Sequence, residues 1–205
     1  MKIIMIFDER LGHNMSKKRF WDEFYSKNNK SWFEWLLKYN ELVEAIDVSR
    51  SFSASRIMLD IGCGSSTFSC EFQKSLRQPS MLICAAFSRD ALKILKKKHQ
   101  SSTNTTPVID YIQCDGRRLP FRDGIFDLAI DKGYLDSILK DGNTKLAHQK
   151  AFESLRATLK CVSSRGVLFQ ITDEPPELRL SFLDDFKLTS SSSKFQLLNT
   201  TFKQI

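Results

Sequence analysis

The sequence has no Cys-x-x-Cys pair, and it contains only three histidines. Its five cysteines, Cys63, Cys70, Cys84, Cys114 and Cys161, form an odd set. Such a set fits neither a secreted disulfide framework nor a zinc motif, and it indicates a reducing compartment. The histidines are scattered at positions 13, 99 and 148. We therefore predict neither a metal site nor a histidine-based catalytic triad.

The first residues also lack the features of a membrane span or a secretory signal. Residues 1–7 are apolar, but Asp8 and Glu9 interrupt them long before a bilayer could be crossed. An Arg-rich mitochondrial presequence is not apparent either. We expect residues 1–15 to form an N-terminal extension that can be flexible. Residues 16–205 are expected to form one domain, because 205 residues can fill a single core.

The chain is moderately basic, with a formal net charge of +7 from 31 basic and 24 acidic residues. Its basic clusters, 17–19 and 96–98, lie on predicted helices without the interleaved aromatic residues of a single-strand-binding platform. We interpret them as solvated surface, so nucleic-acid binding is not predicted.

Apolar runs and helical patterns alternate along the middle of the chain. Strands are predicted over 56–61, 81–86, 108–114, 125–130 and 167–172, and helices over 67–76, from Ser88 onward, 144–159 and 178–186. Two further helices are expected within 16–49, joined around 28–29, and a final strand over 194–200, after a loop at 190–193. This alternation predicts an α/β fold of the Rossmann-like kind, a mostly parallel sheet with helices on both faces.

The loop Asp60-Ile61-Gly62-Cys63-Gly64-Ser65 follows the first of these buried strands. Glycines permit a tight turn there, and a ligand can approach the backbone closely. In an open parallel sheet a cofactor lies beyond the carboxyl ends of the strands, where Ala86, Asp115 and Asp131 also fall. The loop lacks the third glycine of the dinucleotide fingerprint, and Asp60 suits a cationic ligand, which favours S-adenosyl-L-methionine over a dinucleotide.

At these residues the sequence resembles class I S-adenosylmethionine-dependent methyltransferases, and within them a family of protein-lysine methyltransferases. The resemblance covers about residues 17–183. Its motifs are Phe20-Trp21-Asp22-Glu23-Phe24-Tyr25, Trp32-Phe33-Glu34-Trp35, the Asp60–Ser65 loop, 126–136 with Asp131-Lys132-Gly133-Tyr134-Leu135-Asp136, and Gln170-Ile171-Thr172-Asp173-Glu174. The longer stretch from Gln170 to Leu180 is most similar to the citrate synthase lysine methyltransferases, and the group also includes elongation factor lysine methyltransferases.

The resemblance implies roles for particular residues. Trp21, Tyr25 and Trp35 would cover the methionine end of the cofactor, with Asp60, Gly62 and Gly64 beside it. Asp115 and Gly116 would meet the adenine, and Asp131 would close the pocket by the methyl group. Ordinary helix packing for the aromatic residues, and helix capping for Asp115 and Asp131, are the alternatives.

Methyl transfer requires a neutral lysine amine, so a carboxylate near the acceptor would assist loss of its proton. Asp131 and Asp136 are the candidates for that catalytic role, whereas Lys132 is expected to be structural. The resemblance implies a protein substrate, citrate synthase first, then an elongation factor, then a small molecule. It also implies a mitochondrial location, with the cytoplasm as the alternative.

The sequence departs from this family at Ala86, where relatives place an acidic residue that binds both ribose hydroxyls. Losing such a contact weakens binding by about 1.5–3 kcal/mol per hydrogen bond. One alternative is therefore a catalytically weak or inactive methyltransferase-like binding module. An NADP-dependent oxidoreductase, with Arg89 near a 2′-phosphate, is a second alternative that the missing glycine disfavours. The carboxyl end is also short for the antiparallel hairpin that usually ends this fold, so we expect that part to be truncated or its edge to be covered by another segment.

Overall fold

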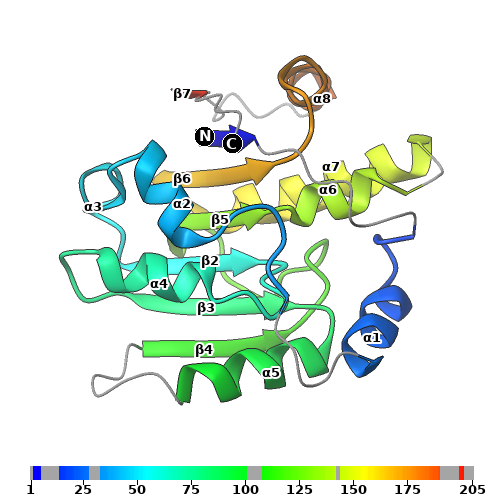
Figure 1. Ribbon diagram of the computed structural model, residues 1–205. Helices are drawn as coiled ribbons and strands as arrows, with labels where there is room; N and C mark the ends of the chain where they lie inside the picture. The colour runs from blue at the N-terminus through cyan, green and yellow to red at the C-terminus, as the bar shows by residue number, and fades with distance from the viewer. Residues whose placement is uncertain are drawn as a thin grey trace.

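The computed structural model describes residues 2–5, 14–27, 33–100, 108–141, 144–189 and 199–200. Within these residues seven strands form one sheet in the order β4-β3-β2-β5-β6-β1-β7 (Figure 1). All six neighbouring pairs are parallel. The strands are β1 (Lys2–Met5), β2 (Ile57–Ile61), β3 (Met81–Ala86), β4 (Val108–Gln113), β5 (Phe126–Lys132), β6 (Val162–Thr172) and β7 (Asn199–Thr200).

Eight helices connect or flank these strands in the described part of the chain. They are α1 (Lys18–Lys27), α2 (Tyr39–Ala45), α3 (Val48–Ser51), α4 (Phe68–Ser75), α5 (Arg89–Gln100), α6 (Tyr134–Leu139), α7 (Thr144–Cys161) and α8 (Pro176–Thr189). The predicted alternation of strands and helices is confirmed. Ser88 also caps α5 as expected, since its Oγ accepts from the Ala91 N–H at 3.5 Å.

Two apolar cores cover the two faces of the sheet, as the near-continuous apolar strands require. On one face, side chains from α2 to α5, including Leu42, Phe72 and Leu95, pack on β2, β3 and β5. On the other face, side chains from α6, α7 and α8, including Ile138, Leu155 and Phe182, pack on the opposite side of the same strands. This double-sided burial fixes the register of the central strands and therefore the position of the loops at their carboxyl ends.

Helix α1 lies apart from both helix layers, beyond the carboxyl ends of β2, β3 and β4 (Figure 1). Its aromatic side chains contact one another: Trp21 stacks on Tyr25 at 6.0 Å between ring centroids, and Phe24 meets Phe33 edge-on at 5.1 Å. An amphipathic helix at this end of a parallel sheet covers the place where ligands bind in such folds. The sequence therefore brings an aromatic surface over the strand ends.

The second helix predicted within 16–49 is shorter than expected. Residues 33–38 are not helical, and helix α2 begins only at Tyr39. The backbone of Leu36 is left-handed, with φ of 68°, which interrupts any helix. The prediction failed because the backbone of these residues bonds to neighbouring segments instead of to itself. The Phe33 N–H donates to Ser65 Oγ, and the Trp35 carbonyl accepts from Lys132. Several other predictions concern residues outside those described, namely His13, Asn28, Asn29, Trp32 and 190–198.

The edge of the sheet beside β6 is covered by β1. Residues Lys2–Met5 pair in parallel with Phe169–Thr172, and β7 pairs in parallel with β1. The sequence did not predict a strand at 2–5, nor the short helix α6. Of the alternatives for that edge, the described residues show another segment covering it, which removes an open row of backbone donors and acceptors.

Candidate active site

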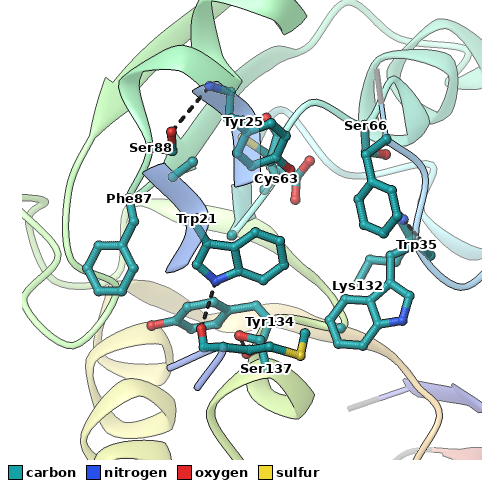
Figure 2. Close-up of a pocket in the computed structure, with 18 of the residues that line it drawn as sticks. Trp21, Tyr25, Trp35, Cys63, Ser66, Phe87, Ser88, Lys132, Tyr134 and Ser137 are labelled. Atoms are coloured by element: carbon teal, nitrogen blue, oxygen red, sulfur yellow. Dashed lines mark hydrogen bonds between the residues drawn. The ribbon is translucent and has the colours of Figure 1, made fainter. Parts of the chain in front are cut away.

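A pocket of about 760 Å³, measured with its opening to solvent, lies at the carboxyl ends of β2, β3 and β5 beneath α1 (Figure 2). Its lining residues are Met15, Ser16, Trp21, Tyr25, Phe33, Trp35, Asp60, Gly62, Cys63, Gly64, Ser66, Ala86, Phe87, Ser88, Ala91, Lys132, Gly133, Tyr134, Ser137 and Ile138. Seven of the ten predicted cofactor residues are among them.

The loop after β2 turns tightly at Gly62 and Gly64, whose φ angles are 70° and 55°. A Cβ on Gly62 would lie 2.6 Å from the Tyr134 Cβ, and one on Gly64 would lie 2.5 Å from the Tyr25 hydroxyl oxygen. The Gly62 and Cys63 N–H groups donate to the Ala85 carbonyl at 2.8 and 3.1 Å. Only glycine allows both the turn and these close approaches, so the backbone itself forms this wall of the pocket.

Asp60 is the one carboxylate among the lining residues, and it is 3% exposed. Burial raises the pKa of Asp60 to about 7, because a charged carboxylate is poorly solvated there. A cationic group entering the pocket would stabilise the ionised form. The carboxylate therefore fits a ligand that carries positive charge.

Aromatic rings form the opposite wall. Figure 2 shows the Trp21 indole between Tyr25 and Tyr134, with Phe87 to one side and Trp35 to the other. The Trp21 Nε1–H donates to the Met15 carbonyl at 2.7 Å, which fixes the ring. Such a wall excludes water and suits the adenosyl and alkyl parts of a cofactor.

The segment 33–35 is fastened across the pocket by a buried ion pair that the sequence did not predict. Lys132 Nζ contacts Glu34 Oε1 at 2.5 Å and donates to the Trp35 carbonyl at 2.6 Å, and both side chains are less than 10% exposed. Ser66 Oγ donates to the same Glu34 oxygen at 2.6 Å. Lys132 is thus structural, as expected, and it holds Trp35 against the pocket.

Ala86 lies at the predicted place, in the pocket lining at the carboxyl end of β3. Its side chain offers no hydrogen bond, and Asp60 remains the only lining carboxylate. Phe87, Ser88, Tyr134 and Ser137 also line the pocket, although the sequence analysis did not single them out. Their positions just after β3 and β5 are the signal that identifies them, because ligands bind at those strand ends.

Asp115 and Gly116 do not line the pocket. Although burial opposes it, the hydrogen bonds from Arg117 bring the pKa of Asp115 below its usual value. The shortest of these joins Arg117 Nη2 to Asp115 Oδ2 at 2.6 Å. Gly116 faces the Tyr134 hydroxyl, which fills the space beside it. Their contact with adenine stays a prediction.

Asp131 and Asp136 are buried behind the pocket rather than in its lining. Asp131 Oδ1 accepts from the Tyr134 and Leu135 N–H groups at 2.8 and 3.2 Å, and Oδ2 accepts from Gln170 at 2.7 Å. Burial, aided by the negative charge of Asp136, raises the pKa of Asp131 to about 6. These contacts correspond to the helix-capping alternative. The catalytic role of Asp131 stays a prediction.

Asp136 forms a buried ion pair with Arg179, and each side chain is 1% exposed. Its Oδ1 also accepts from the Thr172 hydroxyl at 2.5 Å. These contacts favour a structural role for Asp136. A proton acceptor must reach the substrate amine, whereas this carboxylate is already bound by Arg179 and Thr172. Its catalytic role also stays a prediction.

The fold and the pocket define a methyltransferase domain. A family model described as a methyltransferase domain matches residues 59–169, more than half of the chain. The chain therefore belongs to this family, whose cofactor is S-adenosyl-L-methionine. A Methanococcus maripaludis protein assigned as an S-adenosyl-L-methionine-dependent methyltransferase shares the fold, with a TM-score of 0.52, 18% identity, and coverage of 87% of this chain and 73% of that one.

Among curated relatives, the mitochondrial citrate synthase-lysine N-methyltransferase of Danio rerio is 28% identical over 187 residues, covering 83% of this chain and 72% of the relative. The eEF1A lysine and N-terminal methyltransferase homolog of Drosophila melanogaster is 26% identical over 144 residues, 69% of this chain but 20% of that protein. Both relatives modify proteins. In the described part of this chain, no helix is long and apolar enough to cross a membrane.

Proposed function

We propose that this chain transfers a methyl group from S-adenosyl-L-methionine to the side-chain amine of a protein lysine, with citrate synthase as the first candidate substrate. The observation that carries the proposal is the pocket in which Asp60, the Gly62–Gly64 backbone and the Trp21 ring meet at the strand ends. The likeness to two lysine methyltransferases over most of the chain supports a protein substrate.

The cofactor supplies an electrophilic methyl group when it is bound. The pocket residues that would hold it are Trp21, Tyr25, Trp35, Asp60, Gly62, Gly64 and Ala86. The remaining work of the protein is to orient a neutral amine and to exclude water from it. The Glu34–Lys132 pair serves that purpose by holding Trp35 in the wall.

The direct test is methylation of purified citrate synthase and elongation factor 1A from the same organism, followed by mass spectrometry of their lysines. We expect citrate synthase to gain methyl groups only when cofactor and enzyme are both present. The Gly64→Val variant is the matched control. Its Cβ would clash with the Tyr25 hydroxyl, and valine would have to adopt the positive φ of this position. Methylation of the elongation factor alone would make that protein the substrate in place of citrate synthase. Methylation of neither protein would contradict the proposal.

A second candidate function, a binding module without turnover, is favoured by Ala86. If calorimetry detects no cofactor binding by the wild-type chain but detects it for Ala86→Asp, the module is supported instead.

We also propose that the chain is located in the mitochondrion, because the name of the Danio rerio relative describes that protein as mitochondrial. Fractionation of cells that express the tagged chain tests this, and recovery in the cytosol would contradict it.

The roles of Asp131 and Asp136 are tested by Asp131→Asn and Asp136→Asn. If either carboxylate removes the acceptor proton, its variant loses methylation while cofactor affinity is retained. The contacts described above instead predict that Asp136→Asn mainly destabilises the fold, by about 3 kcal/mol or more, because Arg179 is left buried without its partner. Unfolding and single-turnover rates measured on the same samples separate these outcomes.

A further inference from the structure

A cluster of ligand atoms that the cofactor does not account for lies directly beneath the β2 loop. One oxygen of Asp60 and the sulfurs of Cys63 and Cys84 all lie within 4.8 Å of one another, and all three side chains are buried. Asp60 and Cys84 are paired across β2 and β3, and Cys63 follows three residues after Asp60. No sequence motif predicts this set, because only the parallel pairing of two strands brings Cys84 beside the loop.

The thiols of Cys63, Cys70 and Cys84 lie buried in one apolar core. The Cys70 sulfur lies 3.6 Å from His99 Nδ1, and that nitrogen also contacts the Tyr111 hydroxyl. The core beneath the β2 loop therefore holds further polar groups besides the three proposed ligands.

The geometry is close to that of a three-ligand site for a thiophilic ion. Around a tetrahedral Zn²⁺, with Zn–S near 2.3 Å and Zn–O near 2.1 Å, the ligand atoms lie roughly 3.5–3.8 Å apart. The three atoms lie within 4.8 Å of one another, so they would have to move closer together around a bound ion. Asp60 and Cys63 line the cofactor pocket. An ion therefore has a route of entry.

We propose that Asp60, Cys63 and Cys84 bind one thiophilic metal ion of the Zn²⁺ class, and that the ion and the adenosyl cofactor exclude each other. On binding, Cys63 and Cys84 each release a proton to solvent, and their sulfurs bond to the ion. No electron transfer is needed. The exclusion follows because Asp60 is shared and the loop that carries Cys63 forms the cofactor wall.

The first test measures metal binding without cofactor. The full chain, reduced and freed of metal, is titrated with Cd²⁺ while the thiolate-to-cadmium absorption is followed, and Zn²⁺ is then used to displace it. We expect one ion per chain. Cys63→Ser and Cys84→Ser should each weaken binding at least about tenfold. Cys161→Ser is the control, because Cys161 is also buried but lies in the opposite core.

Circular dichroism of each variant shows whether it is folded, and Cys63→Ser, in the loop, provides the test if Cys84→Ser is not. Absence of the absorption band, or a band that survives in both Cys63→Ser and Cys84→Ser, would overturn the site. A band lost equally in Cys161→Ser would do the same.

The second test addresses exclusion. S-adenosylhomocysteine at about ten times its Kd should lower the apparent Cd²⁺ affinity about tenfold if the two ligands cannot be bound together. An unchanged Cd²⁺ affinity under these conditions would refute the exclusion. Neither test depends on methyl transfer, so failure of the proposed lysine methylation would leave both results interpretable.

Discussion

Ala86 occupies the strand end where the family resemblance predicts an acidic residue. It lies at the strand end where a carboxylate would accept hydrogen bonds from both ribose hydroxyls, and the lining offers only Asp60 as an acid. The methyl side chain of Ala86 cannot supply such a charge-assisted anchor. The consequence concerns cofactor affinity rather than the fold, because Ala86 is buried in the apolar core.

The Ala86→Asp variant is expected to bind S-adenosylhomocysteine about tenfold to a hundredfold more tightly than the wild type, since one or two charge-assisted hydrogen bonds are gained. Calorimetry measures the difference. Ala86→Asn is the matched control, with similar volume but no charge, and should gain less. An Asp variant no tighter than the Asn variant would show that the ribose is not held at this position.

His99 provides a separate prediction at the same scale. Burial, with repulsion from Lys74 and Lys98, lowers the pKa of His99 to about 4, and its ring also meets Cys70 and Tyr111. Between pH of about 6.5 and 4 the unfolded chain therefore binds a proton that the folded chain does not. The folded state is accordingly less stable at the lower pH.

The free energy of unfolding should fall by about 1–2 kcal/mol across this interval, a value discounted because the ring is partly exposed. Urea unfolding at several pH values measures it. His99→Gln should remove this part of the decline, whereas His148→Gln on α7 should leave it in place. An identical pH dependence in wild type and His99→Gln would refute the assignment.

At the scale of elements, segment 33–38 joins the N-terminal aromatic residues to the sheet. Glu34 contacts Ser66 and Lys132, and the Phe33 N–H donates to Ser65 Oγ at 2.9 Å. The segment thus links the loop after β2 to the end of β5. Because these contacts replace helical hydrogen bonds, the segment is irregular where the aromatic spacing alone predicted a helix.

Glu34→Gln should destabilise the fold by about 3 kcal/mol, because Lys132 is left buried without its carboxylate. The double variant Glu34→Gln/Lys132→Met should recover a large part of that loss. Asp123→Asn is the control: its pair with Lys160 is more than 60% exposed on both sides, so the change should be under about 1 kcal/mol. Thermal and urea unfolding provide the measurements, and equal effects of Glu34→Gln and Asp123→Asn would contradict a role for burial.

The sequence predicted the central strands well because their apolar runs are buried on both faces and bounded by polar loops. It predicted the cofactor loop because Gly62 and Gly64 follow such a run. It placed Trp35 in the pocket but failed on the backbone of segment 33–38, whose conformation depends on the distant residues Ser66 and Lys132. It also missed the buried pair of Glu34 with Lys132, which has no local signal. The Cys84 side chain illustrates the same limit, since only strand pairing brings it to Asp60.

For the molecule as a whole, one parallel sheet with two separate cores leaves a single set of strand ends for chemistry. Helix α1 and segment 33–38 cover those ends with aromatic rings, and the loop after β2 supplies backbone and one carboxylate. A fold alone does not determine a reaction. The family establishes the cofactor, while turnover and acceptor depend on residues such as Ala86 and Asp60.

The most direct measurement is transfer of a labelled methyl group from S-adenosyl-L-methionine to purified citrate synthase by the wild-type chain and by Gly64→Val. The proposed function predicts lysine labelling by the wild type and none by the variant. Absence of labelling by the wild-type chain on every protein acceptor offered, despite measurable cofactor binding, would contradict it.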